Sequence, residues 1–102
     1  MNEVLILKIT ESNEKKARNI AKLLIKNNLA ACVSLKNITS IYKWEEVVEE
    51  NNEVELTIKS KFELKDDLIM FLQKISSYDV PQILYKEFNS EEKYHTWLTK
   101  TI

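Results

Sequence analysis

The chain has 102 residues, with 15 basic and 16 acidic side chains and a formal net charge of −1. This length fits one domain over residues 1–102, and a hydrophobic content of 44% is enough to build a core, which excludes a disordered chain. The near-neutral charge excludes a protein that coats nucleic acid, because contacts with phosphate groups require a clear excess of basic residues.

The spacing of apolar residues predicts the secondary structure. Alternating or short continuous apolar runs indicate strands, whereas apolar residues at i, i+3 and i+4 indicate amphipathic helices. The first helix can be capped by Ser12 or Asn13, and it can end at Asn27-Asn28 in the left-handed conformation that glycine usually takes. In chain order the predicted elements are a strand at 4–9, this first helix, strands at 29–35, 38–44 and 53–60, a helix at about 62–75, a strand at 82–88, and a short helix capped by Asn89 or Ser90.

This order predicts an α+β fold, the ferredoxin-like β-α-β-β-α-β arrangement with a short C-terminal helix. Two β-α-β units joined by a central hairpin give a four-stranded sheet with its helices on one face. Local chemistry places the turn of that hairpin at Asn51-Asn52, because asparagine tolerates the backbone angles of tight turns. The hairpin is longer than the other strands can pair with, so its free edges and the open sheet face predict a homotrimer.

The usage of glycine and cysteine limits the possible functions. No glycine is present, which excludes a P-loop and a dinucleotide-binding fingerprint. Cys32 is the only cysteine, so the chain has no intrachain disulfide and suits a reducing compartment; we expect it in the cytoplasm. The apolar run at residues 4–7 ends at Lys8, far too short for a signal peptide or a membrane span, so we expect no membrane partner.

No residue carries catalytic chemistry by itself, so we expect the protein not to be an enzyme. His95 is the only histidine, lies off the apolar stripe of the last helix, and has no convincing serine partner. Cys32 has no second cysteine or histidine at metal-ligand spacing, and a mid-strand cysteine is usually a small buried hydrophobe. Six glutamates between residues 45 and 55 could attract hard cations, but they are more typical of a solvated hairpin surface.

Four sequence blocks, read together, resemble the CutA divalent-cation tolerance family. Leu29–Val33 reads LAACV, Ser40–Glu45 matches S-x-Y-x-W, Glu53–Ser60 matches E-x-x-L-x-x-K-[TS], and Tyr94–Leu98 matches Y-x-x-W-[LI]. The resemblance is specific because the four blocks agree in order and spacing. It implies a ferredoxin-like homotrimer, linked to tolerance of divalent cations and to copper binding, with an architecture similar to that of the trimeric nitrogen-regulatory signal transducers.

The chain departs from the family pattern where metal binding is concerned. The family's H-P-Y-E-x-P-E junction corresponds to residues 76–82, where Tyr78 and the second proline remain, Asp79 replaces a glutamate and Ser76 replaces the histidine. Copper ligation in the family is associated with cysteine and histidine side chains, and of these only Cys32 carries over. The resemblance therefore implies that copper or another divalent cation binds at Cys32, and binds weakly.

The resemblance also moves the hairpin turn. The family usually has a glycine at the position that Glu46 occupies here. Family analogy thus places the turn near Glu45-Glu46 rather than at Asn51-Asn52.

The aromatic residues predict a cleft between subunits. Tyr42 and Trp44 point to one side of a strand, and in the family the matching positions lie near where subunits meet. The predicted cleft consists of Tyr42, Trp44, Glu53, Lys59, Tyr78 and Asp79. These residues could hold a small ligand, or they could only bind the trimer together.

Two functions follow as expectations. The first is a divalent-cation tolerance protein of the CutA type, a trimeric metal-linked binding protein that responds to metal ions such as copper. The alternative is a trimeric sensor or scaffold, similar to the signal transducers, which binds a small ligand or a protein partner at the subunit clefts and has no metal role.

Overall fold

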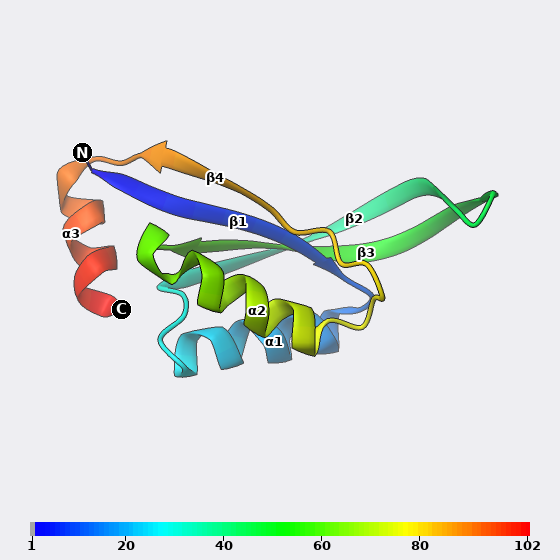
Figure 1. Ribbon diagram of the computed structural model, residues 1–102, viewed down its shortest axis with the longest axis horizontal. Helices are drawn as coiled ribbons and strands as arrows, with labels where there is room; N and C mark the ends of the chain where they lie inside the picture. Colours follow the sequence, from blue (N-terminus) through cyan, green and yellow to red (C-terminus); the bar gives the residue numbers. More distant parts are fainter. Residues whose placement is uncertain (1) are drawn as a thin grey trace.

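Residues 2–102, which the computed structural model describes, form a four-stranded sheet with helices α1 and α2 on one face (Figure 1). In chain order the elements are β1 (Glu3–Glu11), α1 (Glu14–Lys26), β2 (Cys32–Trp44), β3 (Val47–Ser60), a 3-10 turn (Phe62–Leu64) that leads into α2 (Lys65–Ile75), β4 (Leu84–Asn89) and α3 (Glu92–Thr101). The strands lie in the order β2-β3-β1-β4, and every neighbouring pair is antiparallel. The predicted ferredoxin-like α+β fold is confirmed.

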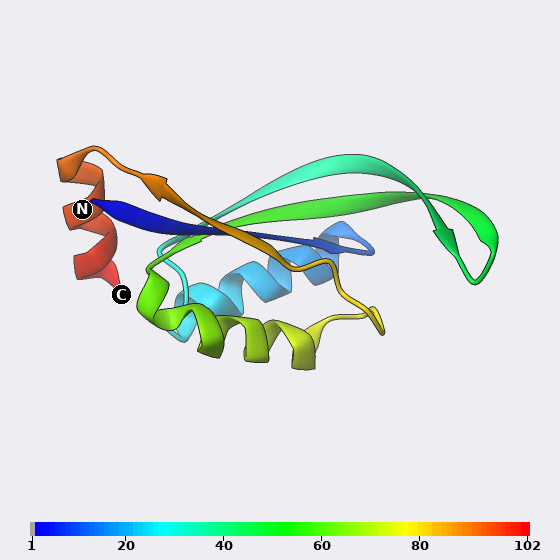
Figure 2. The same cartoon turned by 45° about the horizontal axis from the view of Figure 1, so that its top comes forward.

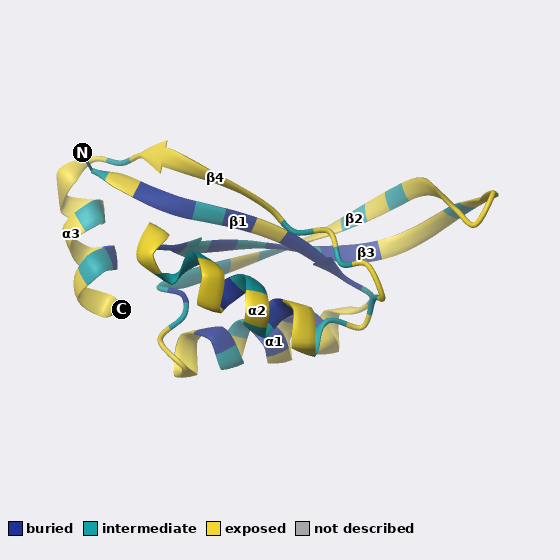
Figure 3. Ribbon diagram, viewed as in Figure 1, coloured by how far each residue is buried: buried dark blue, intermediate teal, exposed yellow. Residues whose placement is uncertain are grey.

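The core lies between the sheet and the two helices α1 and α2. Alternate side chains of β1 and β3 point into this layer, because successive residues of a strand face opposite sides of a sheet. Each fully buried Leu or Ile side chain stabilises the fold by about 1.5–3 kcal/mol. The fully buried core residues from these four elements are Leu5, Leu7, Ile9, Ala17, Leu24, Leu56, Ile58, Leu68 and Leu72. Figure 3 shows the buried stripe on β1 and β3 and the exposed surface of β4.

Helix α1 begins and ends as its sequence indicates. The side chain of Asn13 caps the helix by accepting a hydrogen bond of 2.9 Å from the backbone N–H of Lys16. Asn28 has a φ of 56°, so an asparagine does take the left-handed position after the helix. Of the two predicted capping residues, the Lys16 bond identifies Asn13, and not Ser12, as the cap at the start of the helix.

The turn of the central hairpin lies at Glu45-Glu46, where φ is 50° and 68°. Trp44 pairs with Val47 across the turn, so the loop has two residues with positive φ, as a type I′ turn requires. The expectation of a turn at Asn51-Asn52 is wrong, and family analogy gave the correct place.

Asn51 and Asn52 lie within strand β3 and not in the turn. Asn51 pairs with Ser40 and donates a hydrogen bond of 2.9 Å from its side-chain amide to the hydroxyl of Tyr42. Asn52 accepts a hydrogen bond of 3.2 Å from the hydroxyl of Thr39. These bonds across the two strands occupy the polar groups that a turn would otherwise use, and β2 continues without a break at residues 36–37.

The hairpin extends well beyond the rest of the sheet. Pairing of β3 with β1 stops at Val54, whereas pairing of β3 with β2 continues as far as the turn. We call residues 38–53 the arm; Figure 2 shows it projecting past the ends of β1 and β4. The arm gives the chain an elongated shape, with extents of 45 × 24 × 22 Å.

The C-terminal elements differ slightly from their predicted bounds. The last strand spans Leu84–Asn89 instead of 82–88. Helix α3 is capped by Glu91, not by Asn89 or Ser90, because the Glu91 carboxylate accepts hydrogen bonds from the backbone N–H groups of Lys93 and Tyr94. These bonds lower the pKa of Glu91. Across residues 2–102, every helix is too short or too polar to cross a lipid bilayer.

The turn predicts a stabilising substitution. Glu46 holds a left-handed conformation that costs a non-glycine residue about 1 kcal/mol, so Glu46→Gly should raise the free energy of unfolding by about that amount. Asn52→Gly is the control; it places glycine inside a strand and should lower stability by about 0.5–1 kcal/mol. Urea unfolding at one fixed protein concentration measures both. The reverse order of stability would contradict the turn position.

Candidate functional site

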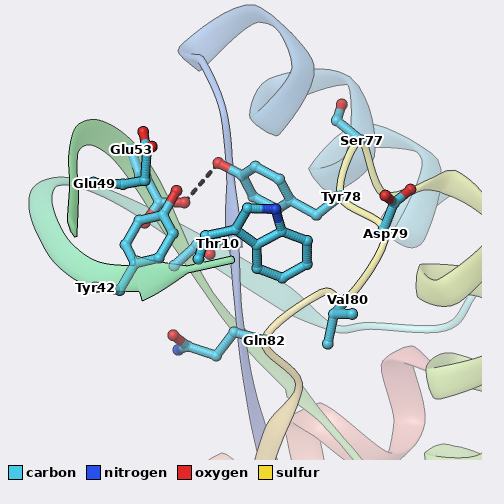
Figure 4. A pocket seen from close by; sticks show the side chains of 10 residues that line it. Thr10, Tyr42, Glu49, Glu53, Ser77, Tyr78, Asp79, Val80 and Gln82 are labelled. Atoms are coloured by element: carbon cyan, nitrogen blue, oxygen red, sulfur yellow. Dashed lines mark hydrogen bonds between the residues drawn. The ribbon is translucent and has the colours of Figure 1, made fainter. Parts of the chain in front are cut away.

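A cavity of about 520 Å³ lies where the arm meets the loop between α2 and β4. We call it the arm cavity. Figure 4 shows the strands on one side and the loop on the other, with side chains from both pointing into the space between them. The residues that line it are Thr10, Tyr42, Trp44, Glu49, Glu53, Ser77, Tyr78, Asp79, Val80 and Gln82. Its volume is that of a pocket for a small molecule.

The strand register brings the first half of this lining together. Tyr42 pairs directly with Glu49 across the arm, so the two side chains lie on the same face. Glu53 lies on that same face, four residues further along β3. Glu53 is also the first residue of β3 beyond the pairing with β1, so the cavity forms where the sheet narrows to the arm.

Buried polar contacts hold the loop against the sheet. The carboxylate of Glu11, which is almost fully buried, accepts hydrogen bonds from the backbone N–H groups of Ser12 (2.8 Å) and Ser77 (3.2 Å). The hydroxyl of Ser76 accepts a bond of 3.1 Å from the N–H of Tyr78. These bonds fix the loop next to the end of β1, which brings the ring of Tyr78 to the arm.

Tyr78 joins the loop to the arm by a hydrogen bond at one wall of the cavity. Its hydroxyl donates to Oε2 of Glu53 at 2.6 Å, a short distance typical of a bond to a carboxylate (Figure 4). The pKa of Tyr78 is raised well above its usual value. The larger cause is burial of the hydroxyl, and the second is its hydrogen bond to Glu53. The hydroxyl therefore stays protonated near neutral pH and holds the Glu53 carboxylate in one orientation.

The lining of the arm cavity is acidic and aromatic. It includes the carboxylates of Glu49, Glu53 and Asp79 and no lysine, arginine or histidine. Three aromatic side chains, Tyr42, Trp44 and Tyr78, also line it. Such a surface favours a positively charged ligand over an anion.

Five of the six residues predicted for the cleft line the arm cavity, and Lys59 does not. Lys59 lies on the same strand as Glu53, but six residues further along, which corresponds to about 20 Å. Its ammonium group donates to the hydroxyl of Ser34 at 3.0 Å and lies 3.9 Å from the sulfur of Cys32. The cation thus belongs to the other end of the sheet.

Sequence reasoning missed several lining residues, and Glu49 and Thr10 matter most. Glu49 could have been found from the turn, because a turn at Glu45-Glu46 places it opposite Tyr42. Thr10 had no local signal. It lines the cavity because the end of β1 lies beside the loop between α2 and β4, and only the tertiary structure brings these two segments together.

Cys32 lies half-buried at the far end of the sheet from the loop. It pairs with Lys59 of β3, one residue before Ser60, where the pairing of β3 with β1 ends at Leu5. The pKa of Tyr94 is raised, first by burial of its hydroxyl and second by the charge of the Cys32 sulfur. Ser76, the position of the family histidine, follows α2 at the opposite end of β1. Within residues 2–102, no three His, Cys, Asp or Glu side chains are arranged to hold a metal ion.

The bond between Tyr78 and Glu53 predicts the effect of one substitution. Tyr78→Phe should lower the free energy of unfolding by about 1 kcal/mol, because it removes a hydrogen bond from a carboxylate that is only 9% exposed. The raised pKa means that above pH ~10 the unfolded chain loses the tyrosine proton first, so wild-type stability falls as the pH rises and the variant should show a smaller fall.

Chemical unfolding between pH 7 and 11 measures this difference. Tyr85→Phe is the control, since Tyr85 is exposed and its hydroxyl makes no hydrogen bond within residues 2–102. An equal loss of stability in both variants would contradict a role for the Tyr78 hydroxyl.

Comparisons with known proteins agree with this architecture. The chain is 39% identical over 77 residues to the mouse "Protein CutA", covering 74% of this chain and 44% of the mouse protein, so it spans less than half of that relative. It is 31% identical to the "Divalent-cation tolerance protein CutA" of Yersinia pestis, over 99% of this chain and 86% of the relative.

The fold matches solved structures equally well. The structure described as the periplasmic divalent cation tolerance protein CutA of Archaeoglobus fulgidus has a TM-score of 0.93 at 26% identity, and the match covers 96% of this chain and 97% of that one. Residues 5–101 match the family model described as "CutA1 divalent ion tolerance protein". The chain therefore belongs to the CutA1 divalent ion tolerance family.

Proposed function

We propose that this chain is a non-catalytic binding protein that acts as a homotrimer in the response to divalent metal ions. The observation that carries the binding role is the arm cavity, a pocket whose walls are held in place by the bond between Tyr78 and Glu53. A fixed pocket without a nucleophile and base pair is suited to recognition more than to a reaction. Family membership supports the link to divalent cations.

The arm and the sheet edges support a trimer. Ile41, Val47 and Val48 on the arm are 67%, 56% and 69% exposed, which is a large apolar surface for a short hairpin. β2 and β4 are edge strands, and every residue of β4 is exposed in the single chain. Neighbouring subunits can cover both features by pairing with the edges and packing on the arm.

The metal role is proposed to involve Cys32, and to be weak. A thiolate is a soft ligand that suits copper(I), and the half-buried sulfur is accessible beside Lys59. Cys32 lies on β2 opposite Lys59, which pairs with Ile6 of β1, whereas residue 76 lies just before the loop bonded to Glu11 at the end of β1. Five residues of strand, about 17 Å, separate Ile6 from Glu11, so one subunit cannot join Cys32 and residue 76 at a metal ion. Any further ligand would have to come from a neighbouring subunit.

A second candidate function is favoured by the contents of the arm cavity. The cavity has the volume and the mixed polar and aromatic lining of a small-ligand pocket, and it lies away from Cys32. This supports a trimeric sensor or scaffold that binds a small ligand or partner at its clefts, with no metal role.

We propose the cytoplasm as the location of the protein. The single free thiol of Cys32 fits a reducing compartment. The Archaeoglobus relative is described as periplasmic, so location differs within the family on this proposal.

The trimer is tested by its mass. Sedimentation at low micromolar concentration should give three times the 12.0 kDa chain mass. Val48→Glu should dissociate the assembly, because it places a charge in an apolar contact, whereas Lys22→Glu on the exposed surface of α1 should not. A monomeric wild type would contradict the proposal.

The metal site is tested by calorimetry with Cu(I), Cu(II) and Zn(II). Copper(I) should bind in the micromolar range or more weakly, and Cys32→Ala should abolish the binding. Ser34→Ala is the control, since it removes the other Lys59 partner and keeps the thiol. Submicromolar Zn(II) binding that survives Cys32→Ala would show that the metal site lies elsewhere.

A further inference from the structure

We propose that the arm cavity binds an organic ammonium ion, a small alkylammonium compound that carries a hydrogen-bond donor. This inference rests on the proposed function as a binding protein and names the ligand class of its pocket. Four features of the described residues lead to it: charge, aromatic walls, an unused hydroxyl group and the absence of a metal-ligand cluster.

The charge of the cavity selects a cation. Glu49, Glu53 and Asp79 line it, and no basic side chain does. Glu53 is 9% exposed and gives one carboxylate oxygen to the Tyr78 hydroxyl, so a negative charge lies at the cavity wall with little solvent around it. An anion would meet repulsion from all three carboxylates, and a neutral ligand would not offset their negative charge.

The aromatic residues select an organic cation. An ammonium group held against the faces of tryptophan and tyrosine is attracted by the ring electrons, and its alkyl groups remove apolar ring surface from water. Tyr42 and Trp44 line the cavity from β2 and Tyr78 lines it from the loop, so the aromatic groups come from two sides. In the single chain Tyr42 and Trp44 are 40% and 43% exposed, so part of each ring is open to a ligand or to a neighbouring subunit.

Thr10 offers a hydrogen-bonding group to a ligand. The residue is only 4% exposed and lines the cavity, and its hydroxyl makes no hydrogen bond within residues 2–102. Among the described residues only the Ser12 hydroxyl is fully buried without a partner, so the Thr10 hydroxyl is not such a group and can bond a ligand that carries an N–H or O–H group. Figure 4 shows Thr10 drawn in the same space as Tyr42 and Tyr78.

A bare metal ion fits the cavity poorly. Calcium needs six to eight oxygen ligands and magnesium needs near-octahedral geometry, so several carboxylates must converge on one point. Within residues 2–102 no three His, Cys, Asp or Glu side chains do so. A volume of about 520 Å³ also suits a molecule of several heavy atoms better than a single ion.

Choline and its neutral isostere 3,3-dimethylbutan-1-ol test the proposal, because they share shape and hydroxyl group and differ in charge. Calorimetry and thermal shift are run on protein whose trimeric mass has been checked. Choline should bind, and the neutral alcohol should bind at least ~10-fold more weakly, since it lacks the attraction to rings and carboxylates. Magnesium chloride at the same ionic strength controls for salt.

Matched variants locate the site. Glu49→Gln and Thr10→Val should each weaken choline binding by roughly 3- to 30-fold, the range expected for loss of one polar or charged contact. Their controls are Glu50→Gln, which is next to Glu49 on the opposite face of the arm, and Thr57→Val on β3, neither of which lines the cavity.

The outcomes separate the two proposals. Equal binding of choline and the alcohol, no binding of choline at about 10 mM by a folded trimer, or an equal effect of Glu49→Gln and Glu50→Gln would each overturn the ammonium site. A monomeric mass would contradict the proposed function even where choline binds. A trimer that responds to copper but not to choline leaves the function standing and removes this inference.

Discussion

The register of the β2–β3 hairpin is the constraint on which the rest of the molecule depends. A two-residue turn at Glu45-Glu46 fixes each pair from Trp44 and Val47 down to Cys32 and Lys59. Because side chains alternate with a period of two, a shift of one residue would turn the core face of β3 toward solvent and the arm's lining away from the cavity. Both turn residues adopt left-handed angles without glycine, so the register is maintained against a local conformational cost.

The cavity exists because β3 pairs with β2 over a longer stretch than it pairs with β1. β1 follows it only as far as Val54, and β2 follows it to the turn. At Glu53, where the sheet narrows, the loop after α2 can reach the arm, and its Tyr78 binds that carboxylate. The buried Glu11 holds the other side of the loop through backbone N–H groups. The carboxylates of Glu11 and Glu53, which lie close together on β1 and β3, thus make different contacts: Glu11 binds the loop backbone and Glu53 binds the Tyr78 hydroxyl.

The two ends of the sheet have different chemistry. The end at Cys32 combines a thiol with the ammonium group of Lys59, and the end at Glu53 combines carboxylates with aromatic rings. The chain belongs to the CutA1 divalent ion tolerance family, and its two ends offer different groups to a ligand. Because Ser76 stands where the family pattern has a histidine, this junction has no imidazole, while it keeps the tyrosine whose hydroxyl bonds Glu53 at the cavity wall.

Local pattern determined much of this protein. Alternation from Glu53 to Ser60, the helical spacing of α1 and the left-handed Asn28 were readable because each depends on neighbours in sequence. The position of the hairpin turn was not readable from local pattern, because Asn51-Asn52 is a better turn sequence than Glu45-Glu46. Only pairing along the whole of β2 and β3 shows that the side-chain amides of Asn51 and Asn52 bond across the strands. Tyr42, Trp44, Glu53, Tyr78 and Asp79 were found through motifs, whereas the separation of Lys59 and the arrival of Thr10 depended on where β1 stops and where the loop crosses the sheet. The sequence by itself determined the elements and their order; the tertiary structure decided which side chains share one cavity, since strands distant in sequence meet only through the register of the assembled sheet.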